Sequence, residues 1–537
     1  MCACHCRYLN LPNPHPMQPT EFSTLPTLVQ QHAQAAPQKL ALRVGASTLT
    51  YGQLAQRMDQ IAGALALSGC VQGDAIAICA NTSIDYAAVF LGALQAGVVV
   101  APLAPSSTPQ SLTRMVSDAD AKLVFTDAAC AGLLAVSGGK TAGGVAVISL
   151  EGAGAGTPFA AWLQTGQEAP VGIQGAVAAI TPLSPFNIIY SSGTTGEPKG
   201  IVQSHGMRWA HIQRGSTYGY SNSTVTLLST PLYSNTTLVV FIPTLAQGGT
   251  VVLMPKFEAL AYLQLAQALR VTHTMLVPVQ YQRLMARPDF DGFDLSSYQM
   301  KFCTSAPFAA NLKAEVLKRW PGGLVEMYGM TEGGGSCILE AHLNPGKLHT
   351  VGRPGLNHDI RLIDDDGLEL PPGATGEVVG HSGSMMTGYH KQPGKTREAE
   401  WFDPQGKRFI RTGDVGRFDE DGFLVLMDRK KDMVISGGFN IYPSDLEALL
   451  RTHPLVQDCA VVGVPSVAWG ETPVAFVVAK AGPARPGLDA ELLAWANAQL
   501  GKTQRLAALR MLAELPRSAI GKVLKRELRD QFDGTVA

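Results

Sequence analysis

Short apolar runs of strand length alternate with helical patterns over about the first two-thirds of the chain, and this alternation limits the possible folds more than any other feature. A helix with one apolar face is expected over residues 54–65, just after Thr50 and Gln53, which have the spacing of a capping box. Three apolar runs have the length of buried strands: Ala75–Ile78, Leu123–Phe125 and Val145–Ile148. Strands separated by helices tend to pair in parallel, so the sequence predicts an α/β fold of mostly parallel sheets covered by helices.

A charged connector, Asp428–Asp432, divides the chain into a large and a small part. At 537 residues the chain is too long for a single compact core. After the connector the pattern is typical of a small α+β domain, beginning with a helix capped by Ser444 and Glu447. Strands are expected there at Cys459–Val464 and Val474–Ala479. The predicted parts are a disordered tail (1–20), a large N-terminal domain (21–428), a hinge (429–432) and a small, mobile C-terminal domain (433–537).

Charge and hydropathy argue against a nucleic-acid-binding or membrane-spanning protein. Lys and Arg total 42 and Asp and Glu 43, so the net charge is −1, and there is no long basic run. The most apolar region, Tyr86–Leu103, begins beside Asp85 and contains Gln95, which favours a buried helix followed by a strand. The opening segment MCACHCRYLNLPNPHP lacks the apolar core of a signal peptide. We therefore expect a cytoplasmic protein with no transmembrane segment and no nucleic-acid partner.

The cysteines indicate reduced thiols. Their number is nine, which is odd, and they are spread over a long chain. Cys2, Cys4, Cys6 and His5 suggest a metal clip, but their one-residue spacing matches no standard zinc site. A disordered tail is the simpler interpretation.

A run of serine, threonine and glycine that leads to a lysine follows the apolar strand Ile188–Tyr190. It reads SSGTTGEPKG and spans Ser191–Gly200. Glycines let backbone N–H groups approach an anion, hydroxyl groups add donors, and Lys199 adds a positive charge. Together these groups are what a polyphosphate requires. The candidate phosphate-binding residues before Lys199 are Ser191, Ser192, Gly193, Thr194, Thr195 and Gly196.

Four further motifs follow in order, and with this loop they resemble the adenylate-forming superfamily, which includes acyl-CoA synthetases, non-ribosomal peptide adenylation domains and firefly luciferase. The motifs are Tyr328–Glu332, Arg411–Asp414, Asp428–Asp432 and Leu515–Lys522. The resemblance covers nearly the whole chain from about Glu21 and is strongest to the acyl-CoA and aryl-CoA ligase branch. It implies that residues 21–428 form an adenylation domain and that the C-terminal domain carries a catalytic lysine. It also implies ATP, Mg²⁺ and coenzyme A as cofactors.

The resemblance implies catalytic roles for four residues. Attack of a carboxylate on the α-phosphate of ATP brings two anions together, so the site must supply positive charge and oriented donors. Lys199 would hold the β- and γ-phosphates, and Thr331 would donate to the α-phosphate. Glu332 would hold Mg²⁺, a hard cation that prefers oxygen ligands. Lys522 would contact both the carboxylate and the α-phosphate during adenylation.

The same resemblance implies a nucleotide site. Asp414 would accept hydrogen bonds from the ribose hydroxyls, and Arg429 would add a contact near the ribose and phosphate. The adenine pocket would comprise Ser305, Glu326, Met327 and Tyr328, whose ring is available for stacking.

If Lys522 serves only the first half-reaction, the small domain must move before a thiol can attack, and the resemblance implies that it rotates about a hinge. Lys431 is expected at the hinge. After rotation, Gly437 and Gly438 would approach the pantetheine channel, where glycines leave room for a narrow thiol arm. Trp469 resembles a CoA-contacting residue of aryl-CoA ligases, although a place in the core of the small domain is an equal alternative.

Acid specificity is expected near Pro231–Thr236. Amino-acid-activating members place an Asp in this region to pair with the substrate ammonium, and its absence here argues against an amino acid. Ser234 stands where many acyl- and aryl-CoA ligases have His, so no role for that histidine is carried over. Asn235 matches an Asn that contacts a ring substituent in dihydroxybenzoate-activating domains, with an Asn satisfied by backbone as the alternative. The remaining candidate pocket residues are Trp209, Gln280, Gly329 and Gly334.

The sequence thus predicts activation of a carboxylic acid by ATP to acyl-AMP and pyrophosphate, followed by thioester formation with CoA and release of AMP. An aromatic or medium-sized acid is favoured over a very long fatty acid. The alternatives are an enzyme that loads an acyl carrier protein, a luciferase-like oxygenase and a non-catalytic nucleotide-binding protein. Retention of Lys199, Glu332, Asp414 and Lys522 together argues against the last. The oligomeric state stays open, with a homodimer as one option.

Overall fold

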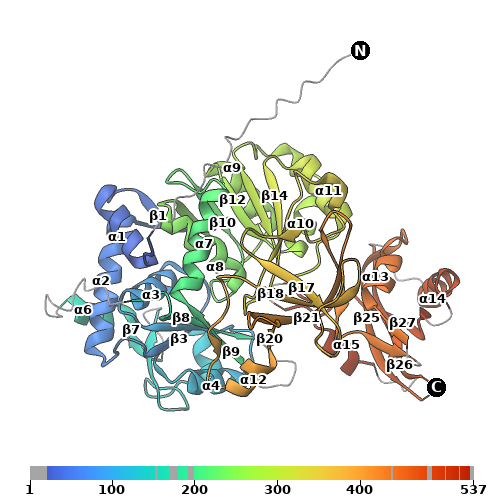
Figure 1. Cartoon of the computed structure of the whole chain (residues 1–537). Coiled ribbons are helices and arrows are strands. Elements are labelled where there is room, and N and C mark those ends of the chain that lie inside the picture. The colour runs from blue at the N-terminus through green and yellow to red at the C-terminus, as the bar shows by residue number, and fades with distance from the viewer. Residues whose placement is uncertain are drawn as a thin grey trace.

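The chain was analysed as a computed structural model (Figure 1). The structure describes residues 21–150, 155–167, 180–191, 199–436, 439–467, 469–480, 486–501, 504–518 and 521–532.

Two large, mainly parallel sheets form the body of the molecule (Figure 1). The eight-stranded sheet consists, in spatial order, of β19 (Gly388–Tyr389), β9 (Lys199–Ser204), β8 (Pro185–Ser191), β4 (Val99–Pro102), β3 (Ala75–Cys79), β5 (Ala121–Thr126), β6 (Ala146–Ser149) and β7 (Thr157–Pro158). The nine-stranded sheet consists of β16 (Arg353–Pro354), β15 (Cys337–Glu340), β14 (Gly323–Tyr328), β13 (Met300–Cys303), β12 (His273–Leu276), β10 (Val225–Leu228), β11 (Thr250–Leu253), β1 (Leu40–Val44) and β2 (Ser47–Thr50). Antiparallel pairs occur only toward the ends of each sheet. The predicted α/β fold is confirmed.

Helices cover these sheets and fill the connections between strands. In the large part of the chain they are α1 (Leu25–Ala35), α2 (Tyr51–Leu67), α3 (Ile84–Gln95), α4 (Pro109–Asp118), α5 (Ala128–Ala131), α6 (Phe159–Gln167), α7 (His205–Thr217), α8 (Asn235–Ala246), α9 (Ala259–Ala268), α10 (Pro278–Met285), α11 (Ala310–Arg319) and α12 (Pro393–Glu398). Thr50 caps α2 as predicted, accepting from the Gln53 N–H at 3.3 Å while the Gln53 side chain accepts from the Thr50 N–H at 2.9 Å. The three predicted strands lie within β3, β5 and β6.

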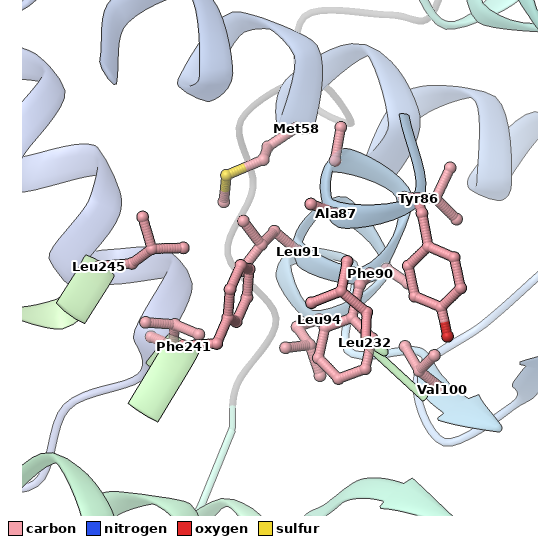
Figure 2. Close-up of a cluster of buried hydrophobic side chains, with 14 of the residues drawn as sticks. Met58, Tyr86, Ala87, Phe90, Leu91, Leu94, Val100, Leu232, Phe241 and Leu245 are labelled. Carbon is pink, nitrogen blue, oxygen red and sulfur yellow. The ribbon is translucent and has the colours of Figure 1, made fainter. Parts of the chain in front are cut away.

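The main hydrophobic core lies where helices from both large sheets meet. Figure 2 shows Met58 of α2 beside Leu91 of α3, with Phe241 and Leu245 of α8 facing them. All four side chains are fully buried. Burial of this apolar surface holds the two sheets together as one body, because each such side chain contributes roughly 1.5–3 kcal/mol when removed from water.

An antiparallel sheet follows the two parallel ones. It consists of β17 (Asp359–Ile363), β18 (Thr375–His381), β21 (Arg408–Phe418) and β20 (Glu400–Phe402), with β22 (Leu424–Arg429) paired to β21. The charged connector therefore begins as the last strand of the large part, since β22 ends at Arg429.

The C-terminal part has its own sheet and its own core. The sheet has the order β24 (Phe439–Ile441), β23 (Val434–Ser436), β26 (Gly470–Ala479) and β25 (Val456–Ser466), with β27 (Ala508–Met511) paired to β26. Its helices are α13 (Pro443–Arg451), α14 (Leu488–Gln499) and α15 (Lys525–Asp530). Two hydrophobic clusters here contain only residues from 434 onward. The expected small α+β domain is confirmed.

The predicted cap of the first helix in this domain is wrong. Helix α13 begins at Pro443, after Tyr442, and has no side-chain cap. The Ser444 hydroxyl donates instead to the Met427 carbonyl, and its N–H donates to Asp428 at 2.8 Å. Glu447 accepts from the Val461 N–H at 2.9 Å. Both side chains thus join α13 to neighbouring strands rather than closing its own first turn.

Two further features concern the described residues alone. None of the helices in this part of the chain is both long and apolar enough to cross a membrane. The six described cysteines are all free thiols and all buried, in agreement with the predicted reduced state. Cys2, Cys4, Cys6 and His5 lie outside the described residues.

The close approach of α2 and α3 generates a stability prediction. A Cβ added at Gly92 would lie 2.6 Å from the Cβ of Ile61, whereas a Cβ at Gly132 would meet nothing within 4 Å. We expect Gly92→Ala to lower the free energy of unfolding by about 1–3 kcal/mol because the buried helices must separate. Gly132→Ala is the matched control and should leave the melting temperature unchanged. Equal melting temperatures for both variants would contradict the packing described here.

Candidate active site

The predicted phosphate loop connects two neighbouring strands. β8 ends at Ser191 and β9 begins at Lys199, and these two residues lie opposite each other in an antiparallel pair. Ser192, Gly193, Thr194, Thr195 and Gly196 lie outside the described residues. The paired strands fix both ends of the loop, so Lys199 is held at the edge of the eight-stranded sheet.

Tyr389 brings the predicted phosphate lysine and the predicted metal ligand together. The Lys199 ammonium lies 5.1 Å from the centroid of the Tyr389 ring. The Tyr389 hydroxyl donates to Glu332 Oε1 at 2.9 Å. Burial, and then the charge of Glu332, raise the pKa of Tyr389, so it stays a donor at neutral pH. A cation for phosphate and a carboxylate for a hard cation therefore flank one aromatic side chain, which the sequence analysis did not identify.

Thr331 is fixed by its backbone. Gln203 of β9 donates from its side-chain amide to the Thr331 carbonyl at 2.7 Å. This bond links the loop after β14 to the strand that begins at Lys199, so Thr331 and Lys199 are positioned by the same element.

The predicted ribose-binding residues lie together. Asp414 of β21 lies opposite Arg429 of β22, and its Oδ1 is 3.1 Å from the Arg429 Nε. The Tyr328 hydroxyl donates to Asp414 Oδ2 at 2.8 Å. A cleft of about 380 Å³ opens beside this pair and is lined by Thr412, Gly413, Arg429, Lys430 and Lys431. Two donors orient the carboxylate, and Arg429, Lys430 and Lys431 make the neighbouring cleft cationic.

The candidate adenine residues lie on β14 and just after β13. One of them, Glu326, has its side chain buried in the core. Ser305 adopts φ +80°, and its hydroxyl is 2.6 Å from that of Thr236. The Met327 carbonyl accepts from Thr304 at 2.7 Å. The Glu326 side chain is buried and forms an ion pair with Lys313 of α11. Burial raises the pKa of Glu326 to about 7, against the opposing effect of Lys313. Since this side chain serves the core, only the Glu326 backbone is left to contact a nucleotide.

Lys522 is brought to the ribose site from the other end of the chain. Its side chain is exposed. Partial enclosure, together with the positive charges of Arg429 and Lys431, lowers the pKa of Lys522 to about 8, while Asp414 acts in the opposite direction. These interactions place its ammonium close to the groups that line the cleft.

The loop that carries Lys522 rests on the large domain at one close contact. Gly521 adopts φ +76°, and a Cβ there would lie 2.8 Å from Val279 Cγ1 on α10. Within the loop, the Ser518 N–H donates to the Lys522 carbonyl at 2.8 Å. A glycine is therefore required next to Lys522, both for the backbone angle and for the close approach of the domains.

The predicted hinge is enclosed by charged partners. Burial, and then the positive charges of Arg429 and Arg529, lower the pKa of Lys431. Asp432 pairs with Arg529 of α15 at 2.7 Å, and Lys430 pairs with the exposed Asp365 at 2.7 Å. Lys430 is thus bound to the large domain, and Asp432 to the small one, on either side of Lys431.

The predicted CoA-contacting residues are only partly described. Gly437 and Gly438 lie outside the described residues. Trp469 is 58% exposed, so the alternative that it belongs to the core of the small domain is wrong. It precedes Gly470, which pairs with Ser436 between β23 and β26. An exposed indole next to this strand pair is available for a ligand.

Several candidate acid-pocket residues also make structural contacts. Ser234 caps α8 by accepting from the Thr236 N–H at 3.2 Å. Gln280 accepts from the Val277 N–H at 3.1 Å and donates to Ser229 at 3.2 Å. The Trp209 ring packs edge-on against Phe22, with 5.9 Å between centroids.

The two candidate pocket glycines, Gly329 and Gly334, both lie close to other parts of the protein. A Cβ at Gly334 would lie 2.9 Å from Ile410 Cβ and 3.0 Å from the Gly380 carbonyl oxygen, so the glycine makes room for the antiparallel sheet. A Cβ at Gly329 would lie 2.9 Å from the Ser336 hydroxyl. Both positions are closed by the protein.

Asn235 contacts a buried arginine that the sequence analysis did not single out. Its Oδ1 accepts from Arg208 Nη1 at 2.8 Å, so the alternative of an Asn satisfied by backbone is wrong. Neither the spacing nor the composition around Arg208 signalled its burial, because an arginine on a helix is exposed in most cases.

Family comparison agrees with this arrangement. The model of the AMP-binding enzyme family matches residues 29–390, and that of the AMP-binding enzyme C-terminal domain matches residues 445–522. The chain belongs to the AMP-binding enzyme family. It is 33% identical to a feruloyl-CoA synthase of an Amycolatopsis species over 511 residues, which span 94% of this chain and 98% of that one.

The chain is also similar to a family member with a different acceptor and to a member whose crystal structure is known. A fatty acid–[acyl-carrier-protein] ligase, ScoC, of Streptomyces coeruleorubidus is 31% identical over 525 residues, which cover 96% of this chain and 98% of that one. The ATP-bound crystal structure of MatB from Rhodopseudomonas palustris superimposes with a TM-score of 0.82 at 28% identity, over 95% of this chain and 99% of that one.

The ribose site yields a direct prediction. Asp414→Asn keeps a hydrogen-bond acceptor but removes the charge that pairs with Arg429. We expect the dissociation constant for ATP, measured by isothermal titration calorimetry, to rise about tenfold or more. Asp365→Asn is the matched control, because Asp365 is exposed and pairs only with Lys430 among the described residues. Unchanged ATP affinity in Asp414→Asn would exclude Asp414 from the nucleotide site.

Proposed function

We propose that this enzyme is an AMP-forming acid–CoA ligase that activates a carboxylic acid with ATP to acyl-AMP and pyrophosphate, and then forms the CoA thioester and releases AMP. The observation that carries the proposal is the contact of the Lys522 loop with the large domain, where Gly521 packs on α10 and Lys522 interacts electrostatically with Asp414 and Arg429. Lys522 of the small domain and Asp414 of the large domain can act on one nucleotide only when the two domains are docked in this way.

Each group has a distinct task in the first half-reaction. Asp414, oriented by Tyr328 and Arg429, holds the ribose. Lys199 and Lys522 supply positive charge on two sides of the phosphates, where negative charge accumulates as the carboxylate oxygen attacks the α-phosphorus and pyrophosphate leaves. The Thr331 loop, held by Gln203, places donors near the α-phosphate.

Mg²⁺ fits the residues present. Glu332 offers carboxylate oxygens, the ligand type that Mg²⁺ prefers, and Tyr389 engages only Oε1. A bound Mg²⁺ would neutralise phosphate charge there. Within the part of the chain that the structure describes, no group of three or more His, Cys, Asp or Glu could hold a metal by itself. The phosphates must therefore complete the coordination, as is usual for Mg²⁺ with a nucleotide.

The second half-reaction requires the C-terminal domain to move, and Lys431 is the proposed hinge for this movement. In the present arrangement the loop around Gly521 packs on α10 and Lys522 faces the cleft, so a thiol needs this domain to turn away. The paired charges at Lys430 and Asp432 flank a short segment that can absorb such a rotation. Trp469, which is exposed, and the 437–438 segment would then contact CoA.

The names of similar enzymes support a class of carboxylic acid and a thiol acceptor for the proposed reaction. The similarity to feruloyl-CoA synthase and to an indoleacetate–CoA ligase of Aromatoleum aromaticum supports an aromatic acid and CoA as substrates. The similarity to ScoC favours a carrier protein as the second candidate acceptor.

An assay of AMP release tests the function directly. Purified enzyme is incubated with ATP, Mg²⁺ and CoA over a panel of aromatic, heteroaromatic and straight-chain acids. We expect AMP release that depends on both CoA and one structural class of acid. Pyrophosphate release without use of CoA would overturn the CoA assignment and support a carrier protein, and no nucleotide turnover with any acid would overturn the ligase assignment.

A substitution at Lys522 should affect the two half-reactions differently. We expect Lys522→Ala to lower the rate of adenylate formation about a hundredfold or more, because it removes charge that is needed in that transition state. Thioester formation from supplied acyl-adenylate and ATP binding should change little. An equal loss in both half-reactions would contradict this role.

The wild-type pH profile provides an independent check. Since the pKa of Lys522 is lowered to about 8, its ammonium is present below that pH and is lost as the pH rises through it. Adenylation should therefore fall above about pH 8, while Lys522→Arg, which keeps its charge, should lack this decline. A decline that persists unchanged in Lys522→Arg would assign the titration to another group.

A further inference from the structure

A buried arginine is surrounded by neutral side chains where β8, β9, α7 and α8 meet. Arg208 of α7 is 1% exposed. Its guanidinium donates to Asn187 Oδ1 on β8 at 2.9 and 3.1 Å, to Asn235 Oδ1 at the start of α8 at 2.8 Å, and to Gln203 Oε1 on β9. A fifth contact joins its Nη1 to His211 Nδ1 at 3.4 Å. A guanidinium has five N–H groups, so these contacts use Arg208 entirely within the protein.

An arginine can only donate hydrogen bonds, and this fixes the orientation of the amides around it. Asn187 turns its oxygen toward Arg208, so its Nδ2 is left to donate to Gln203 Oε1 at 3.0 Å. Gln203 Oε1 thus accepts from two donors. Reversal of the Gln203 amide would place its NH₂ group against these donors, where no acceptor is present. The Gln203 amide therefore has one favourable orientation.

The donor end of the Gln203 amide holds the loop that carries Thr331. Its Nε2 donates to the Thr331 carbonyl at 2.7 Å, and the next carbonyl, that of Glu332, accepts from the Met386 N–H at 2.8 Å. Gln203 is fully buried, so water does not compete for its bonds. The Thr331 side chain is partly exposed, and none of the described residues forms a hydrogen bond with its hydroxyl. The backbone of Thr331 is thus fixed while its hydroxyl stays available.

Stability alone does not account for this network, because well-packed apolar side chains stabilise a core as well as or better than a buried charge. We infer that Arg208 and Asn187 lock the amide of Gln203, and that Gln203 is a positioning residue that holds Thr331 for adenylation. The Thr331 hydroxyl then donates to the α-phosphate from a fixed position as negative charge develops there. This inference rests on the proposed ligase function and adds a buried network to the groups that serve it.

Replacement of the Gln203 amide by a carboxylate tests the inference. Gln203→Glu keeps the oxygen that accepts from Arg208 and Asn187, but puts a second oxygen in place of the donor that faces the Thr331 carbonyl. The carboxylate stays ionised beside the guanidinium, so it cannot donate. The readout is kcat for acid-dependent pyrophosphate release at saturating ATP, Mg²⁺ and the most active acid of the panel proposed above. We expect kcat to fall about tenfold or more, while the melting temperature changes little.

Removal of the arginine tests the lock itself. Arg208→Met leaves the Gln203 amide free to reverse, so kcat should fall in this variant as well. Gln53→Glu is the matched control, because it adds the same charge at the exposed start of α2 and keeps the oxygen that accepts from the Thr50 N–H. Its kcat should equal that of the wild type. Full activity of a folded Arg208→Met would overturn the assigned lock.

A double-mutant cycle with Thr331→Val distinguishes positioning from a general structural role. Valine has nearly the shape of threonine but no hydroxyl, so Thr331→Val removes the group that Gln203 is proposed to position. In this background Gln203→Glu should lower kcat further by no more than about twofold. If Gln203→Glu does not fold, Gln203→Met, which also lacks the donor, takes its place in the cycle.

Two results would overturn the inference and leave the ligase function intact. One is wild-type kcat in Gln203→Glu. The other is an equal fall of kcat with and without the Thr331 hydroxyl, which a structural defect would produce. Failure of every acid to support pyrophosphate release by the wild-type enzyme would instead overturn the proposed function, and the inference with it.

Discussion

The ion pair between Asp414 and Arg429 is the interaction on which the site depends. It joins β21 and β22 at the point where the large domain ends and the hinge begins. The same carboxylate accepts from Tyr328 on the nine-stranded sheet and lies near Lys522 from the small domain. A single negative charge thus organises three parts of the fold and partly balances the positive charges of Arg429, Lys431 and Lys522 around it.

This excess of positive charge has a chemical reason. A site that receives a polyphosphate and a carboxylate must balance several negative charges, and it can do so with little reorganisation if the cations are already in place. Burial, followed by repulsion among those cations, lowers the pKa of both Lys522 and Lys431. The small domain is then held near the cleft by packing, as at Gly521 on α10, and by pairs such as Asp432 with Arg529. A balance between repulsion and these docking contacts suits a domain that must bind to the large domain and later rotate away from it.

The region where the acid is expected has a different arrangement of charge. There the polar side chains Asn187, Gln203 and Asn235 surround a buried guanidinium and are fully used in holding it. The Asn187 amide also donates to Gln203, and the Gln203 amide donates to the Thr331 carbonyl, so the network is connected. Glycines nearby, such as Gly334, serve close packing against the antiparallel sheet rather than substrate volume.

Local patterns were sufficient for much of the fold. The capping box at Thr50, the strands β3, β5 and β6 and the small domain after the connector all follow from hydrogen-bonding groups and apolar spacing within a few residues. The cap at Ser444 failed because a neighbouring strand offered its side chain a better partner in the Met427 carbonyl. Short-range rules cannot anticipate such competition from residues outside the helix.

The sequence by itself determined the α/β architecture, the two-domain division and, through ordered motifs, the residues expected to serve ATP. Only the tertiary structure decided that Tyr389 links Lys199 to Glu332, that Glu326 pairs with Lys313, and that Arg208 is buried among amides. The physical reason is that burial and charge pairing depend on which distant segments meet. An arginine, a tyrosine or a glutamate has the same local pattern whether it faces solvent or a partner far away in the chain.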